Sequence, residues 1–180
     1  MARRSITFSA GFCIMLALAI LLIPVSWLVS VLAAAIVHEL CHHLAIRFMT
    51  GSWASTRLLF HSARIAIPDL SAGNEAFCAL AGPVGGMMLA CLWEYFPKLA
   101  ICGLMQSIYN MIPVYPMDGG RVVRILLSLF CTPPVVRAIM NCIAILFRIV
   151  CLLVGVYCWW FLKLGFLPML FSVLICIRVK

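Results

Sequence analysis

Apolar runs long enough to cross a lipid bilayer occupy most of this 180-residue sequence, and they limit its fold more than any other feature. Hydrophobic residues make up 66% of the chain and charged residues 10%, whereas a soluble domain has about 25% charged residues. A soluble single domain is therefore excluded. Because one helical crossing takes about 20 apolar residues, the chain has room for about six helices. We predict an all-α polytopic membrane protein that forms a single integral membrane domain over residues 1–180, with no appended soluble domain.

Prolines, glycines and charged residues mark the ends of the predicted helices. We expect transmembrane helices at 6–25, 27–48, 75–96, 99–111, 135–156 and 162–178. The first run is longer than the apolar core of a secretory signal and a second run follows at once, so we predict an uncleaved helix. An amphipathic or half-buried segment opens at Gly119 and ends near Pro133. Tyr157, Trp159 and Trp160 indicate an interface belt between the last two helices.

Between the second and third predicted helices lies a polar connection. Residues 56–67 within it are rich in β-branched and aromatic residues, and Pro68 closes the stretch. This pattern predicts a short membrane-associated β hairpin. Such a strand could bind a substrate strand by edge pairing. His61 within the stretch is expected to be solvated.

Basic residues are distributed unevenly over the predicted connections. With a cytosolic N-terminus, ten of the Lys and Arg residues fall on the cytosolic side, only Lys98 and Lys163 fall outside, and Arg148 lies within the fifth helix. The positive-inside rule accounts for this bias, so the net charge of +8 calls for no nucleic-acid partner. We predict a multi-pass protein of the cell membrane with both termini cytosolic. Arg148 either pairs or lines a water path, or else snorkels to the surface.

The segment His38-Glu39-Leu40-Cys41-His42 places three ionisable side chains inside the second predicted helix. Residues i and i+4 share a helix face, so both imidazoles can bind one metal ion while Glu39 reaches a metal-bound water. Zinc suits this pattern because it binds His nitrogens and a carboxylate, keeps a position for water and lowers the pKa of that water. Since an ionisable group in a membrane helix costs about 2.5 kcal/mol or more unless paired or functional, a zinc site is favoured over a chance pattern.

Two residues beside this pattern, His43 and Cys41, are less favoured as metal ligands. His43 follows His38 by five residues and therefore points about 140° away from the shared face, so we expect it to support the site or to lie at an interface, and not to be a ligand. Cys41 does approach the face and stays an alternative ligand. A thiolate would, however, compete for the open position that hydrolysis needs.

A catalytic zinc ion normally takes a third protein ligand, and the chain has five acidic residues: Glu39, Asp69, Glu75, Glu94 and Asp118. Glu94 falls at the outer end of the third predicted helix, away from the histidines. Asp118 follows a helix predicted to run in the same direction as the histidine helix, and prolines before it free the chain from helical geometry. Gly119 and Gly120 allow close backbone approach. Together with the histidine pattern, this favours Asp118 as a ligand over an ordinary turn residue.

The stretch Asn110-Met111-Ile112-Pro113-Val114-Tyr115-Pro116-Met117-Asp118-Gly119-Gly120-Arg121 resembles the second motif of the site-2 protease family of intramembrane zinc metalloproteases. The HELCH pattern on an earlier helix matches that family's first motif. The stretch Ala81-Gly82-Pro83-Val84-Gly85-Gly86 is similar to its central glycine motif. The motifs lie within 27–130, and the six-helix layout resembles the sporulation-factor subgroup of Gram-positive bacteria.

This resemblance implies that His38, His42 and Asp118 bind one zinc ion per chain and that Glu39 is the catalytic residue. Asn110 and Pro113 would help to bind the substrate or hold the site. The implied function is intramembrane proteolysis, in which a peptide bond of a membrane-spanning or membrane-associated protein is hydrolysed near the cytosolic leaflet. Cys41 stands where many members have glycine, and no PDZ or CBS domain is recognised, which leaves the substrate and its regulation open.

Other classes of function stay open. A metal-handling transporter would use the His and Asp residues as a permeation site, but it predicts further polar residues that the outer half offers only sparsely. A catalytically silent scaffold would bind membrane partners, although Glu39 argues against it. The expected partners are a membrane-tethered protein substrate and the lipid bilayer, with a regulatory membrane partner or a homo-oligomer left open. Gly82 and Gly86 form a GxxxG pair typical of close helix packing, which we favour over a direct substrate role.

Overall fold

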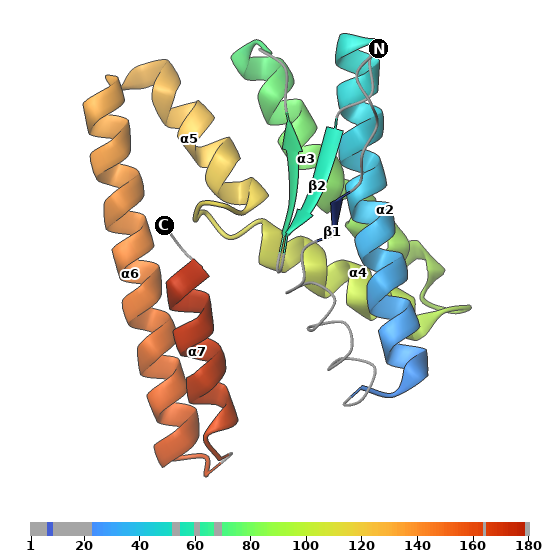
Figure 1. Cartoon of the computed structure of the whole chain (residues 1–180), viewed down its shortest axis with the longest axis vertical. Helices are drawn as coiled ribbons and strands as arrows, with labels where there is room; N and C mark the ends of the chain where they lie inside the picture. The colour runs from blue at the N-terminus through green and yellow to red at the C-terminus, as the bar shows by residue number, and fades with distance from the viewer. Residues whose placement is uncertain are drawn as a thin grey trace. The chain divides into compact units, whose positions relative to one another are not determined.

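The computed structural model describes residues 7–8, 23–51, 55–59, 62–66, 70–163 and 165–178. These residues form six α-helices, α2 to α7, a short 3-10 helix η1 and three strands (Figure 1). The chain divides into two compact units, Met1–Asn110 and Met111–Lys180, which are described in turn. The expectation of one domain stays a prediction.

Three helices form the body of the first unit: α2 (Val25–Thr50), α3 (Ala72–Met88) and α4 (Pro97–Asn110), with η1 (Leu89–Leu92) between the last two. Each of these three helices packs against the other two. The first of them ends where Gly51 takes a left-handed conformation, φ 69°, and donates its backbone N–H to the Arg47 carbonyl oxygen at 2.8 Å.

The third predicted helix is shorter than the sequence indicated. We expected helix from 75 to 96, but α3 ends at Met88, and turns follow η1. Pro97 begins α4, and a proline disfavours helical geometry in the residue before it, here Phe96. The fourth predicted helix, 99–111, matches α4 within two residues at each end.

Three short strands accompany these helices. The strands β2 (Ser55–Leu59) and β3 (Ser62–Ala66) are antiparallel neighbours, with Leu59 opposite Ser62, and they correspond to the predicted hairpin. Strand β1 (Thr7–Phe8) pairs with β2 in parallel, so these two residues are not helical as we had expected. Residues 6 and 9–22 of the first predicted helix, and His61, lie outside the described residues. Membrane association of the hairpin stays a prediction.

One lysine links the beginnings of two helices in this unit. Lys98 of α4 donates a hydrogen bond from Nζ to the Ser26 hydroxyl oxygen of α2 at 2.7 Å. The same Nζ lies 5.7 Å from the centroid of the Trp27 ring, within cation–π range. The contact therefore joins the first turns of α2 and α4.

The second unit consists of α5 (Asp118–Phe130), α6 (Pro133–Trp160) and α7 (Leu167–Arg178). Helices α6 and α7 pack side by side (Figure 1). A Cβ atom on Gly155 would overlap the Ser172 side chain, so the glycine permits this close contact. The Cys176 thiol donates to the Arg148 carbonyl oxygen at 3.5 Å and links the two helices further.

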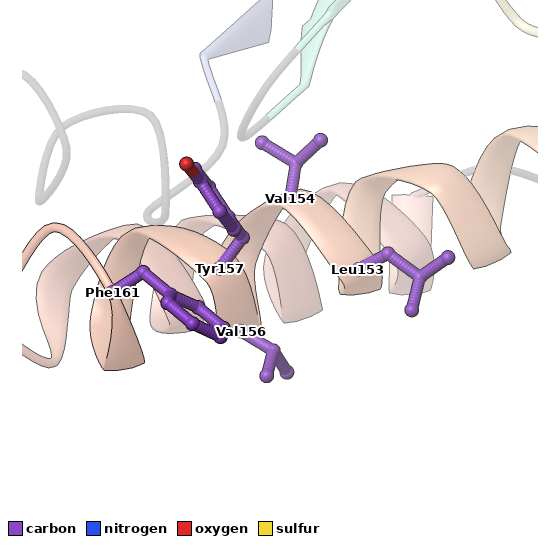
Figure 2. A pocket seen from close by; sticks show the side chains of 5 residues that line it. All are labelled: Leu153, Val154, Val156, Tyr157 and Phe161. Atoms are coloured by element: carbon purple, nitrogen blue, oxygen red, sulfur yellow. The ribbon is translucent and has the colours of Figure 1, made fainter.

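The connection between the last two helices differs from the prediction. Tyr157, Trp159 and Trp160 belong to the final turns of α6 and do not separate two helices. Helix α7 begins at Leu167, later than the expected residue 162, because Gly165 at φ 80° cannot continue a helix. Figure 2 shows an apolar depression on this part of α6, lined by Leu153, Val154, Val156, Tyr157 and Phe161.

Among the described residues, three helical segments are long and apolar enough to cross a membrane: Val25–Thr50, Ala72–Leu92 and Pro133–Trp160. Helix α4 has 14 residues and therefore spans about 21 Å, less than the hydrocarbon thickness of about 30 Å. The described chain thus has six α-helices and three candidate spans, as fits a multi-pass membrane protein. Six full crossings stay a prediction.

Candidate metal centre

Helix α2 presents its two histidines on its buried side. His38 and His42 are each 4% exposed, and they continue a stripe that includes Ala34, Ala45 and Ile46. One helical turn separates the two histidines, so their rings project from the same face. The helix thus brings together the two imidazoles that the sequence predicted.

The ring nitrogens of this pair have a separation that suits one metal ion. The Nε2 atoms of His38 and His42 lie 3.2 Å apart, and the two rings meet edge to face with centroids 4.8 Å apart. With Zn–N bonds of about 2.0–2.1 Å and a tetrahedral angle, two ligand nitrogens should lie about 3.4 Å apart. The two imidazoles therefore fit a zinc ion that binds both Nε2 atoms.

The other nitrogen of His42 is bound to the neighbouring helix. Its Nδ1 lies 2.7 Å from the carbonyl oxygen of Cys78 on α3, in a buried position. A carbonyl oxygen can only accept, so Nδ1–H is the donor, and in a neutral imidazole Nε2 then carries the lone pair. The hydrogen bond thus leaves Nε2 as the atom that can bind a metal.

Glycines on α3 make room for the side chains of α2. A Cβ atom on Gly82 would overlap the His42 ring, and one on Gly85 would overlap the Cys41 sulfur. One turn beyond Gly82, a Cβ atom on Gly86 would overlap the Ser107 hydroxyl oxygen on α4. The prediction that Gly82 and Gly86 serve close helix packing is therefore confirmed.

The remaining polar residues of the pattern are less buried than the two histidines. Glu39, Cys41 and His43 are all half-buried on α2. The Cys41 sulfur lies against Gly85, where the absent side chain leaves it space. The catalytic role of Glu39 and the alternative of Cys41 as a ligand both stay predictions.

Asp118 is the first residue of α5, in the second unit, and it is 8% exposed. Its Oδ1 atom lies 3.9 Å from Nη1 of Arg121, one turn along the same helix. A carboxylate in the first turn of a helix also interacts favourably with the helix dipole. The third predicted ligand is therefore a buried carboxylate at a helix N-terminus.

Backbone contacts hold the beginning of α5 against the loop before it. A Cβ atom on Gly119 would overlap the backbone of Met111 and Ile112, and one on Gly120 would overlap that of Val114 and Tyr115. The Met117 N–H donates to the Val114 carbonyl oxygen at 2.9 Å and closes the loop. The expectation that the two glycines permit close backbone approach is confirmed.

The two residues predicted to bind substrate lie just before and within this loop. Asn110 ends α4, and its Nδ2 donates to the Gln106 carbonyl oxygen at 3.1 Å. Pro113 is exposed. Neither the hydrogen bond of Asn110 nor the exposure of Pro113 tests a role in substrate binding, and this role stays a prediction for both residues.

Apart from Glu39 on α2 and Asp118 on α5, the acidic residues of the described chain lie at the start of α3 and after η1. Glu75 is half-buried in the first turn of α3, and Glu94 is exposed in the turn after η1. Asp69 lies outside the described residues. Among the described residues, His38, His42 and Asp118 are buried, and each offers one atom that could bind a metal ion.

Two features of α3 that contact His42 were not predicted from the sequence. The Cys78 carbonyl oxygen and the space at Gly82 both act on His42, but a backbone carbonyl leaves no mark in the sequence. The spacing of four residues between Cys78 and Gly82 shows that they share a helix face. Only the packing of α3 on α2 shows that this face meets His42.

The chain is similar to known proteins in sequence and in fold. The chain is similar to zinc metalloprotease MJ0392 of Methanocaldococcus jannaschii, with 28% identity over 142 residues that cover 68% of this chain and 41% of that protein. The chain therefore spans less than half the length of this relative. Its structure is similar to that of the site-2 protease from Methanocaldococcus jannaschii, with a TM-score of 0.68, 18% identity, and coverage of 96% of this chain and 88% of that chain. No protein-family profile matches the chain.

The structural similarity shows that the chain has the fold of a site-2 protease. The sequence similarity is to a zinc metalloprotease, and the three predicted ligand residues are buried. The resemblance of the sequence motifs to this family is thus supported independently. The sporulation-factor subgroup stays a prediction.

Proposed function

We propose that this chain is an intramembrane zinc metalloprotease of the site-2 protease family. The observation that carries the proposal is the pair of Nε2 atoms 3.2 Å apart on α2, a helix able to cross a membrane. Two buried imidazoles at metal-ligand spacing are costly in a membrane helix unless they have a function. The similarity in sequence and fold to metalloproteases supports the same conclusion.

In this proposal His38, His42 and Asp118 hold one zinc ion per chain. The support is that all three are buried and that each offers one ligand atom. Two imidazole nitrogens and one carboxylate oxygen form a typical donor set of a catalytic zinc site, which keeps one position open. When bound, zinc polarises the scissile carbonyl group and activates the attacking water.

Glu39 is the proposed general base and acid of the reaction. Its carboxylate takes a proton from the water whose oxygen adds to the carbonyl carbon of the substrate. Glu39 then gives this proton to the amide nitrogen as the C–N bond breaks, so that a carboxylic acid and an amine leave. Its place next to His38 on α2, half-buried, supports this role.

The proposed substrate is a membrane-spanning or membrane-associated protein cut near the cytosolic leaflet. A helical substrate hides its carbonyl groups in intrahelical hydrogen bonds, so it has to unwind locally before water can attack. Asn110 and Pro113 are proposed to bind this unwound segment, on the strength of the motif alone. The excess of basic residues on one side supports cytosolic termini.

Co-expression with tagged substrates tests the proposal. The wild-type chain is expressed with a panel of epitope-tagged single-pass membrane proteins, beside Glu39→Gln and the control Glu94→Gln, which removes an exposed carboxylate elsewhere. We expect a soluble tagged fragment in the cytosol from the wild type and the control, and a loss of at least about 100-fold in Glu39→Gln with zinc retained.

Two outcomes would contradict the proposal. Cleavage by Glu39→Gln at the wild-type rate, with zinc still bound, would exclude the proposed mechanism. Transport of zinc across the membrane of vesicles that contain the protein, without cleavage, would favour the hypothesis of a metal-handling transporter.

A further inference from the structure

We propose that Gly82 of α3 is a positioning residue for the zinc ligand His42. In this inference, the absent side chain at Gly82 and the carbonyl oxygen of Cys78 together orient the imidazole so that its Nε2 atom meets that of His38. The inference rests on the proposed zinc site and adds to it a residue that touches neither metal nor substrate.

The space at Gly82 is filled by the imidazole itself. A Cβ atom at this position would overlap Nε2, Cε1 and Cδ2 of His42. All three overlapping atoms belong to the end of a side chain that can rotate, and none belongs to the backbone. A methyl group at Gly82 would therefore displace the ring while the helices keep their packing, and the displaced atoms include the one proposed to bind zinc.

The hydrogen bond to Cys78 shows why the ring cannot move without consequence. Nδ1 of His42 is held 2.7 Å from the Cys78 carbonyl oxygen, and its Nε2 lies 3.2 Å from that of His38. Cys78 and Gly82 lie one turn apart on α3, so the imidazole extends along one face of this helix. A rotation that relieves an overlap at Gly82 breaks the Nδ1–H bond or moves Nε2 away from His38.

Gly86 provides a matched control on the same helix. Both glycines are buried, and a Cβ atom on either would overlap a polar side chain of a neighbouring helix. The neighbour of Gly86 is Ser107 of α4, with the Gly103 carbonyl oxygen beside it, and not a proposed ligand. Gly86→Ala therefore disturbs the packing of α3 to a similar degree without touching His42.

The test compares zinc affinity with stability in three full-length proteins in detergent. Zinc affinity is measured by competition with a chromophoric chelator, and the midpoint of thermal unfolding is measured without metal. We expect Gly82→Ala to weaken zinc binding by about 10- to 100-fold, as is typical when a partner that orients a ligand is lost. We expect Gly86→Ala to keep the wild-type affinity while its unfolding midpoint falls at least as far as that of Gly82→Ala.

Spectroscopy supplies two readouts that a purely structural role would not change. With cobalt in place of zinc, the visible spectrum should shift in Gly82→Ala and stay unchanged in Gly86→Ala. In the zinc-loaded wild type, ¹⁵N spectra should show His42 protonated on Nδ1 and bound through Nε2, with His42→Gln used to assign the signals. This second measurement does not depend on the folding of a glycine variant.

Three results would overturn the inference: wild-type zinc affinity in Gly82→Ala, an equal loss of affinity in both glycine variants, or metal bound through Nδ1 of His42. A wild-type protein that binds no zinc would instead remove the proposed function on which the inference rests.

Discussion

The two histidines and Asp118 are held in place by different physical means. His38 and His42 lie within a regular helix, and a hydrogen bond from one imidazole to α3 orients the ring. Asp118 begins a helix, and its position depends on Gly119 and Gly120, which bring the backbone of α5 against the preceding loop. A small change near the histidines should therefore alter the site without unfolding the protein, whereas a small change beside Asp118 should disrupt the local fold.

The largest expected effect comes from removing the ligands themselves. We expect wild-type protein to hold about one zinc ion per chain and the double variant His38→Ala, His42→Ala to hold none, because both proposed nitrogen ligands are lost. Alanine favours helix, so α2 should persist. Asp118→Ala should weaken both zinc binding and cleavage. Metal analysis of the purified proteins measures this, with Glu94→Gln, which removes an exposed carboxylate elsewhere, as a control that keeps its zinc, and full zinc occupancy in the double variant would refute the site.

A smaller but still large effect is expected from Gly120→Ala. Its Cβ atom would overlap backbone atoms of Val114 and Tyr115, which cannot turn aside as a side chain can. We expect the free energy of unfolding to fall by about 3 kcal/mol. In the control Gly73→Ala the new Cβ atom meets nothing within 4 Å, and the helix should gain about 0.5–1 kcal/mol. Denaturant titration in detergent measures both stabilities. Equal stability of the two variants would show that the backbone contact at Gly120 does not hold the start of α5.

The smallest expected effect concerns the ion pair beside Asp118. Arg121 lies 3.9 Å from Asp118 across one helical turn, at the long end of the range for a salt bridge. We expect Arg121→Gln to change zinc affinity by less than about fivefold, which corresponds to about 1 kcal/mol. Chelator competition measures the change. A loss of more than tenfold would mean that the arginine, and not the backbone contacts of the glycines, holds Asp118.

Regular spacing and backbone chemistry explain which features could be read from the sequence. The pairing of His38 with His42 follows from helix geometry alone, and α4 ends at Asn110 because prolines follow. The close approach at Gly119 and Gly120 could be expected because a residue without a Cβ atom lets another backbone segment come close. These features depend on residues close together in the chain.

The features that could not be read depend on how helices pack. Nothing in the sequence fixes the register of α3 on α2, so the bond between His42 and the Cys78 carbonyl was not foreseeable. The end of α6 was misplaced because its aromatic residues suggested an interface, although Tyr157 and Trp160 are equally compatible with a helix. Stacking of Tyr157 on Phe161, with ring centroids 5.2 Å apart, extends ordered contact beyond the predicted end.

The contact of Lys98 with Ser26 and Trp27 has a consequence for the supply of water to the histidines. An ammonium group and an indole ring both favour the membrane–water interface, so this contact marks one end of α2 as interfacial. From Ser26 to His38 the helix axis advances about 18 Å, more than half of a hydrocarbon layer of about 30 Å. From His42 to the exposed Arg47 it advances only about 7.5 Å. We therefore expect water to reach the histidines from the Arg47 end, and a hydrophilic product to leave by the same short route.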